Sequence, residues 1–217
     1  MRHRAAALGR DPPALVALVL AAGTVLRLVL AATLGMGVDE SYATVVARAP
    51  SLSYFDHPPL SFWIPALLAR VAGTERAVVL RLPFILLFAG TTWLTYRIGA
   101  RLFGRAAGAW AAALLNLAPV FAVSTGGWVL PDGPLDCFML AAVWCVSRAL
   151  LTPSRAPTAW WMGAGLAAGL AALSKYHAVF LPAGVALFLA TSREHRRVLR
   201  TPGPWVAAAI AAACALP

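Results

Sequence analysis

The sequence predicts an all-α protein, a multi-pass transmembrane helical bundle whose polar residues gather at one face of the membrane. Hydrophobic residues make up 61% of the 217 residues and charged residues only 12%, against about 45–50% and about 25% in soluble domains. The apolar residues form long runs, and the basic residues lie in short clusters between them, as in the loops of membrane proteins. The bilayer is therefore the solvent that suits this chain.

The charge balance is basic, with 18 Lys and Arg against 8 Asp and Glu. A nucleic-acid groove would combine basic and aromatic residues in one patch, and this sequence has no such patch. Cys137 and Cys145 are separated by roughly 12 Å on one helix, which is too far for a disulfide. No pair among them and Cys214 has metal-ligand spacing, so all three are interpreted as small apolar residues.

The first apolar run, residues 14–34, is long enough to span the membrane. It exceeds the usual signal-peptide core of roughly 7–15 residues. Arg27 lies inside the run, at an insertion cost of about 2.5–3.5 kcal/mol that the surrounding Leu and Val residues offset. We expect Arg27 to face protein rather than lipid.

Residues 36–80 are predicted to be an outer loop with interfacial helices. Residues 36–60 are polar and interrupted by prolines. Residues 60–72 are apolar but too short to span, which favours a helix lying in the interface.

Further apolar runs predict the remaining spans of a single transmembrane domain, residues 1–217. They cover residues 82–99, 106–123, 135–151, 159–173, 176–191 and 205–217, which makes about six or seven spans in all. Gly165 and Gly169 form a small-xxx-small face suited to helix packing. The last run stops after 13 residues without a polar flank, which predicts a chain truncated at its C-terminus.

The basic residues set the predicted orientation. With a cytoplasmic N-terminus, twelve arginines lie inside: Arg2, Arg4, Arg10, Arg97, Arg101, Arg105, Arg148, Arg155, Arg193, Arg196, Arg197 and Arg200. Five basic residues lie outside: Arg48, Arg70, Arg76, Arg81 and Lys175. This asymmetry predicts a cytoplasmic N-terminus, and we expect a multi-pass protein of the cell (inner) membrane whose candidate site lies on the extracytoplasmic face. Six carboxylates also fall outside: Asp39, Glu40, Asp56, Glu75, Asp132 and Asp136.

Two motifs in the first outer loop could carry chemistry. Asp39-Glu40 follows the first span and is either a carboxylate general base or a pair of solvated loop acids. Asp56-His57 precedes two prolines that restrict the backbone. That segment either presents an acid and an imidazole at a fixed place or serves only as a stiff connector.

Two further motifs lie at the same predicted face. Asp132 belongs to a Pro-Asp-Gly turn, where it could simply cap the next helix. Lys175, in the run Ser-Lys-Tyr-His, could bind a phosphate as a compact cation. The alternative is a helix-end lysine that extends its charge to the interface.

In this order the motifs resemble glycosyltransferase family 39 of the GT-C superfamily, which includes the protein mannosyltransferases and the lipid A aminoarabinose transferase. The matching segments are Asp-Glu at 39–40, Tyr-Phe-Asp-His-Pro-Pro-Leu at 54–60, Arg-Leu-Pro at 81–83, Pro-Asp-Gly-Pro-Leu at 131–135 and Leu-Ser-Lys-Tyr at 173–176. The resemblance extends from residue 14 to about residue 190, nearly the whole chain.

The resemblance implies a membrane enzyme that moves a hexosyl or pentosyl group from a polyprenyl-phosphate donor to a lipid, glycan or protein acceptor, with inversion, on the outer face. It implies catalytic carboxylates at Asp39 and Glu40. The donor phosphate and substrate would meet Asp56, His57, Asp132, Lys175, Tyr176 and His177. The residues provide no metal site, the family leaves a divalent metal open, and no nucleic acid is expected as a partner.

Two alternatives remain. Arg27 within a span and the broken helix near Lys175 would suit a transporter or channel subunit, although the spans show no inverted repeat and the acids lie in loops. The other is an inactive relic of the glycosyltransferase that still inserts.

Overall fold

The computed structural model describes residues 11–152 and 157–216, and these ranges contain helices and no strand. The predicted all-α class is confirmed. The chain contains α2 (Pro12–Thr33), α3 (Val38–Ala47), α4 (Leu60–Ala72), α5 (Ala77–Phe103), α6 (Arg105–Leu117), η1 (Val120–Ser124), α7 (Asp132–Leu151), α8 (Pro157–Ser174), η2 (Tyr176–Val179), α9 (Phe180–Thr191), η3 (Arg196–Arg200) and α10 (Pro202–Ala215). Arg2, Arg4, Arg10 and Arg155 of the predicted inner side lie outside the described residues.

Two compact units divide the chain. The first comprises Met1–Pro50 and Phe62–Gly133, and the second comprises Ser51–Ser61 and Pro134–Pro217. Each unit therefore collects segments that are far apart in the sequence.

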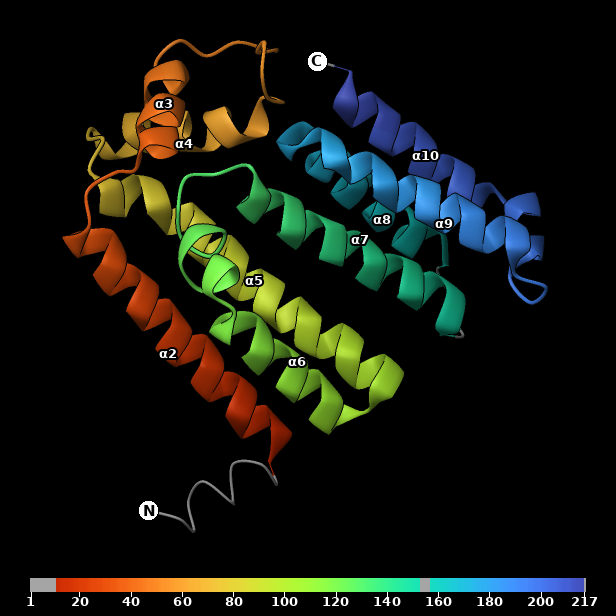
Figure 1. Ribbon diagram of the computed structural model, residues 1–217. Coiled ribbons are helices and arrows are strands. Elements are labelled where there is room, and N and C mark those ends of the chain that lie inside the picture. Colours follow the sequence, from red (N-terminus) through yellow and green to blue (C-terminus); the bar gives the residue numbers. More distant parts are fainter. Residues whose placement is uncertain (1–10, 153–156, 217) are drawn as a thin grey trace. The chain divides into compact units, whose positions relative to one another are not determined.

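In the first unit α2, α5 and α6 pack against one another (Figure 1). Val16 of α2 is buried against Tyr96 of α5 and Ala109 of α6. The chain turns from α5 into α6 at Gly104, whose φ of 94° lies in the region that favours glycine. Gly108 then lies directly against the Tyr96 carbonyl, so α6 approaches α5 more closely than a side chain would allow.

Arg27 of α2 faces protein, as predicted, with 5% of its surface exposed. Its Nη1 donates to Asn116 Oδ1 at 3.1 Å and its Nη2 to the Phe121 carbonyl at 3.2 Å. The guanidinium also lies 4.2 Å from the centre of the Phe88 ring, a cation–π geometry. The arginine that interrupts the first apolar run is thus held by α5, α6 and η1.

The predicted span at residues 106–123 is not one continuous α-helix. α6 ends at Leu117, Ala118 is extended, and the π-helical turn η1 follows. Pro119 explains the break, because a proline disfavours helical geometry at the residue before it and lacks an N–H to continue the ladder.

In the second unit α8 and α10 lie along each other (Figure 1). Gly165 of α8 contacts the backbone of Ala207, and a Cβ added at Gly169 would lie 2.5 Å from the Cβ of Cys214. The predicted packing face of small residues is confirmed. At one end of this unit Leu135 of α7 packs with Ala171 and Ala178.

Three helices in the described part of the chain are long and apolar enough to cross a membrane: Pro12–Thr33, Ala77–Phe103 and Asp132–Leu151. They coincide with predicted spans. The other predicted spans correspond to α6, α8, α9 and α10, which are shorter or less apolar. The predicted number of six or seven spans stays a prediction. The segment 60–72 forms α4, and α3 precedes it in the same loop.

Candidate active site

The first unit builds its acidic motif at the start of α3. Gly37 is the N-cap residue, and Asp39 and Glu40 lie in the first helical turn, where carboxylates complement the helix dipole. The Gly37 N–H donates to Glu40 Oε2 at 2.9 Å, which is the backward hydrogen bond of a capping box. The two adjacent acids point in different directions, and their environments differ completely.

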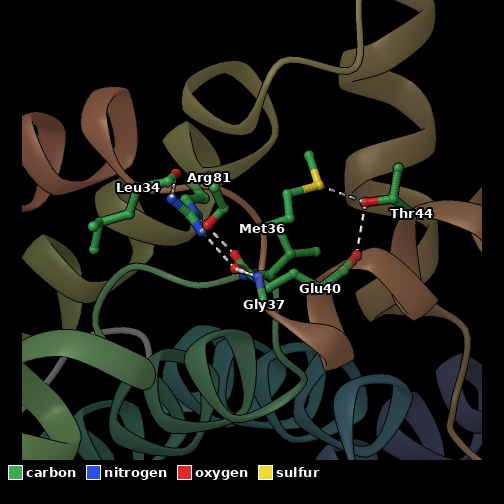
Figure 2. Close-up of polar contacts among 8 residues, drawn as sticks. Leu34, Met36, Gly37, Glu40, Thr44 and Arg81 are labelled. Atoms are coloured by element: carbon green, nitrogen blue, oxygen red, sulfur yellow. Dashed lines mark hydrogen bonds and ion pairs between the residues drawn. The ribbon is translucent and has the colours of Figure 1, made fainter.

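Glu40 is fully buried and paired with Arg81 of α5, which is 2% exposed. Arg81 Nε donates to Oε1 at 2.7 Å, and Nη2 donates to Oε2 at 2.6 Å (Figure 2). The Val129 N–H donates to Oε1 at 3.0 Å. With the Gly37 bond, each Glu40 oxygen accepts two hydrogen bonds, which fills the roughly four lone-pair sites of a carboxylate.

Arg81 also ties down the chain between α2 and α3. Its Nη1 donates to the Leu34 carbonyl at 2.9 Å and its Nη2 to the Gly35 carbonyl at 2.8 Å (Figure 2). One guanidinium therefore joins α5, the end of α2 and the start of α3. Through Glu40 and Val129 the same network reaches the segment between η1 and α7.

The environment of Glu40 favours its ionised form. Burial acts to raise the pKa of the Glu40 carboxyl, but the hydrogen bonds from Arg81, Gly37 and Val129 and the charge of Arg81 outweigh it, and the pKa lies below its ordinary value. The structure therefore favours a charged Glu40 whose two oxygens are both fully hydrogen-bonded.

Asp39 is exposed, and its carboxylate makes no hydrogen bond or ion pair with any residue that the structure describes. The Asp39 carboxylate is therefore free to accept a proton or a hydrogen bond, whereas the neighbouring Glu40 carboxylate has no lone pair left. Asp132, the other predicted acid of this unit, is the first residue of α7 and is half-buried.

The second unit holds the remaining predicted residues. His57 Nδ1 lies 3.2 Å from Asp56 Oδ2, and both side chains are about one-third exposed, at 39% and 34%. The two prolines that follow are buried, and Ser61 Oγ donates to the Pro58 carbonyl at 3.4 Å. The acid and the imidazole are therefore neighbours on a segment anchored by its prolines.

Lys175 separates α8 from η2 with an extended backbone, φ −157° and ψ 143°. It is half-buried, whereas Tyr176 and His177 are exposed. The His177 ring lies 6.2 Å from the ring of Phe180. The predicted break at Lys175 is present, and it places three polar side chains at the end of α8.

The predicted site residues are thus divided between the units: Asp39, Glu40 and Asp132 in the first, and Asp56, His57, Lys175, Tyr176 and His177 in the second. Sequence reasoning did not predict the partnership of Arg81 with Glu40. The available signal was an arginine inside an apolar helix, which requires a partner, together with six acids at the same predicted face. No group of three His, Cys, Asp or Glu suited to a metal occurs within residues 11–152 and 157–216.

Long apolar helices and a polar motif anchored at their ends define the class, a multi-pass membrane protein. The chain belongs to the dolichyl-phosphate-mannose-protein mannosyltransferase family, whose family model matches residues 56–217. The resemblance to glycosyltransferase family 39 is confirmed by this match.

Two relatives are consistent with this assignment. The chain is 27% identical over 169 residues to undecaprenyl phosphate-alpha-4-amino-4-deoxy-L-arabinose arabinosyl transferase 1 of Proteus mirabilis (strain HI4320), covering 71% of this chain and 31% of the relative. It superposes on the S. cerevisiae protein O-mannosyltransferase Pmt1-Pmt2 complex bound to the sugar donor with a TM-score of 0.73 and 21% identity, covering 94% of this chain and 33% of that chain. The chain therefore spans about a third of the length of these relatives.

Proposed function

We propose that the chain is part of a membrane glycosyltransferase that moves a monosaccharide, a hexose or a pentose, from a polyprenyl-phosphate donor to an acceptor on the extracytoplasmic face. The observation that carries this proposal is the contrast between Asp39 and Glu40 in the first turn of α3. Family membership and the names of the two relatives support the class of donor.

Asp39 is the general base of the proposed reaction. Its carboxylate accepts the proton of an acceptor hydroxyl while that oxygen attacks the anomeric carbon. The bond from the anomeric carbon to the phosphate oxygen breaks, and the phosphate leaves with the electron pair. Direct displacement inverts the anomeric centre. Glu40 is not available as a base, because both of its oxygens already accept two hydrogen bonds. Its proposed role is to fix the first turn of α3, which carries Asp39.

The departing phosphate needs positive charge and hydrogen-bond donors. We assign this role to Lys175 and His57, and we place Asp56, whose Oδ2 lies 3.2 Å from His57 Nδ1, at the same donor site. Tyr176, His177 and Asp132 are proposed to contact the sugar or the acceptor. The proposal requires no metal ligand set.

The first test compares Asp39→Asn with the wild type in the longest available chain. We expect turnover of a polyprenyl-phosphate sugar to fall by roughly 10²-fold or more, the scale for loss of a general base. Donor binding and membrane insertion should be unchanged, because Asp39 has no structural partner among the described residues. Asp11→Asn, an exposed acid just before α2, is the control. Near-normal turnover by Asp39→Asn would leave Asp39 a solvated loop acid.

Binding of the donor separates this proposal from a transporter of water-soluble solutes. Lys175→Met keeps most of the apolar stem and removes the charge, so it should weaken donor binding by about 1.5–3 kcal/mol, the range for a hydrogen bond to a charged group. A protein that shows no saturable polyprenyl-phosphate binding would favour the transporter.

A further inference from the structure

We infer that the second unit binds an anionic phospholipid at the end opposite Lys175. The headgroup phosphate is bound by the arginines between α9 and α10, and an acyl chain occupies the apolar groove beside them. This site takes no part in the proposed sugar transfer.

The segment between α9 and α10 concentrates unpaired positive charge. Arg193, Arg196, Arg197 and Arg200 fall within it, with Glu194 as its single acid. All five side chains are exposed, and none makes a hydrogen bond or ion pair with any residue that the structure describes. By contrast, the surface residue Arg48 forms an ion pair with Glu75. The cluster therefore offers its full positive charge to an anionic partner.

An apolar groove of about 180 Å³ adjoins this segment. Its lining includes Leu189, Leu199, Pro204 and Trp205, so residues before, within and after the arginine segment form one part of its wall. The rest of the wall comes from Ala142 and Val146 of α7, Trp161 and small residues of α8, Leu181, Pro182, Val185 and Ala186 of α9, and alanines of α10, and none of these residues is charged. Because its lining is apolar, the groove suits part of an acyl chain better than a polar ligand.

The position of the groove fits a lipid. Trp205 is 64% exposed and donates its indole N–H to the Leu199 carbonyl at 2.9 Å, and tryptophan favours the membrane–water interface. Leu135, near the start of α7, packs beside the Lys175 end, whereas Val146 lines the groove. The arginine segment thus lies at the far end of the unit from Lys175.

Charge and shape select one occupant. A basic cluster next to a span attracts anionic headgroups, and the groove supplies the apolar surface that a soluble phosphate would not use. A zwitterionic phospholipid carries the same phosphate but also a cationic group that the arginines repel, so it would leave their net charge uncompensated. An anionic phospholipid satisfies both parts at once.

The test titrates the full chain in detergent micelles with phosphatidylglycerol carrying brominated acyl chains, and reads the quenching of Trp205 as the difference from Trp205→Phe. We expect strong, saturable quenching by this lipid and only weak, non-saturable quenching by brominated phosphatidylcholine at the same concentration, because an exposed Trp205 meets any lipid in the micelle by collision. Arg196→Gln with Arg197→Gln should weaken the binding about 25-fold, or about fivefold for each arginine. Arg105→Gln, an exposed and unpaired arginine of the first unit, should leave it unchanged.

A second variant tests the groove alone. Ala186→Phe, at an exposed position of α9 that lines the groove, should abolish quenching while the arginines remain. The inference would be overturned if both lipids quenched Trp205 equally, or if Arg105→Gln weakened lipid binding as much as the double arginine variant. It would also be overturned if glycerol 3-phosphate, at the same concentration as the lipid, competed with it. Normal quenching in Ala186→Phe would do so as well.

Discussion

Arg81 and Glu40 form a buried ion pair on which three segments of the first unit depend. In the variant Glu40→Gln the Arg81 guanidinium, which is only 2% exposed, has no counter-charge. Breaking one side of a buried pair costs about 3–5 kcal/mol, because an uncompensated charge remains. We expect a large fall in the melting temperature of the chain in detergent. The double variant Glu40→Leu with Arg81→Met should recover much of this loss, since both charges are removed together.

The Arg48–Glu75 pair provides the control. It has the same bidentate form, with 2.9 and 2.6 Å bonds, but it is exposed. Glu75→Gln should therefore change the melting temperature much less than Glu40→Gln, because solvent already screens the pair. Equal losses in the two variants would show that burial is not what makes Glu40 important.

The pH dependence of stability follows from the same pair. The pKa of the Glu40 carboxyl is held below its ordinary value by Arg81, Gly37 and Val129, which together outweigh the opposing effect of burial. Ionised Glu40 therefore stabilises the folded state fully at pH values above the unfolded pKa of about 4.3. This stabilisation is lost as the pH falls through the lower pKa of the folded state. The difference in melting temperature between wild type and Glu40→Gln should be largest at neutral pH and should narrow below about pH 4. A constant difference down to pH 3 would contradict the assignment.

At the level of residues, the sequence predicted which charged side chains matter better than it predicted the groups that bind them. Arg27 was expected to face protein because an arginine inside a span is costly in lipid, and it does. That Asn116 and the Phe121 carbonyl would hold it depends on where α6 ends in space. Likewise, six acids share the predicted outer face, and only folding places Glu40 rather than another beside Arg81.

At the level of elements, the length of the apolar runs predicted the helices but not every point at which a helix ends. The segment 60–72 was expected as a helix and forms α4 with those bounds. The break after α6 was missed because residues 106–123 are apolar on both sides of Pro119, and hydropathy does not register a backbone constraint. The division into two units brings residues 51–61 together with residues 134–217, a long-range grouping that local patterns do not encode.

The packing of α8 on α10 can be tested with two glycines of the second unit. A Cβ at Gly165 would collide with the Ala207 backbone, whereas Gly184 has nothing within 4 Å. Gly165→Ala should destabilise by about 1–3 kcal/mol, the usual cost of overpacking. Gly184→Ala should be neutral or stabilising by up to about 1 kcal/mol, because alanine favours a helix. Thermal unfolding of the two variants gives the comparison, and a similar loss in both would show that α8 and α10 are not in close contact.

At the scale of the whole molecule, the arrangement in the membrane decides whether Asp39 can meet an extracytoplasmic acceptor. The uneven distribution of basic residues predicts that the loop between α2 and α5 is outside and that the segment between α9 and α10 is inside. Single cysteines at Leu52, which is 68% exposed, and at Arg196, also exposed, report on the two sides once Cys137, Cys145 and Cys214 are replaced by serine. A membrane-impermeant maleimide added to intact cells should label Leu52→Cys at once, and Arg196→Cys only after permeabilisation. The reverse labelling pattern would place Asp39 on the cytoplasmic side and would contradict a reaction on the extracytoplasmic face.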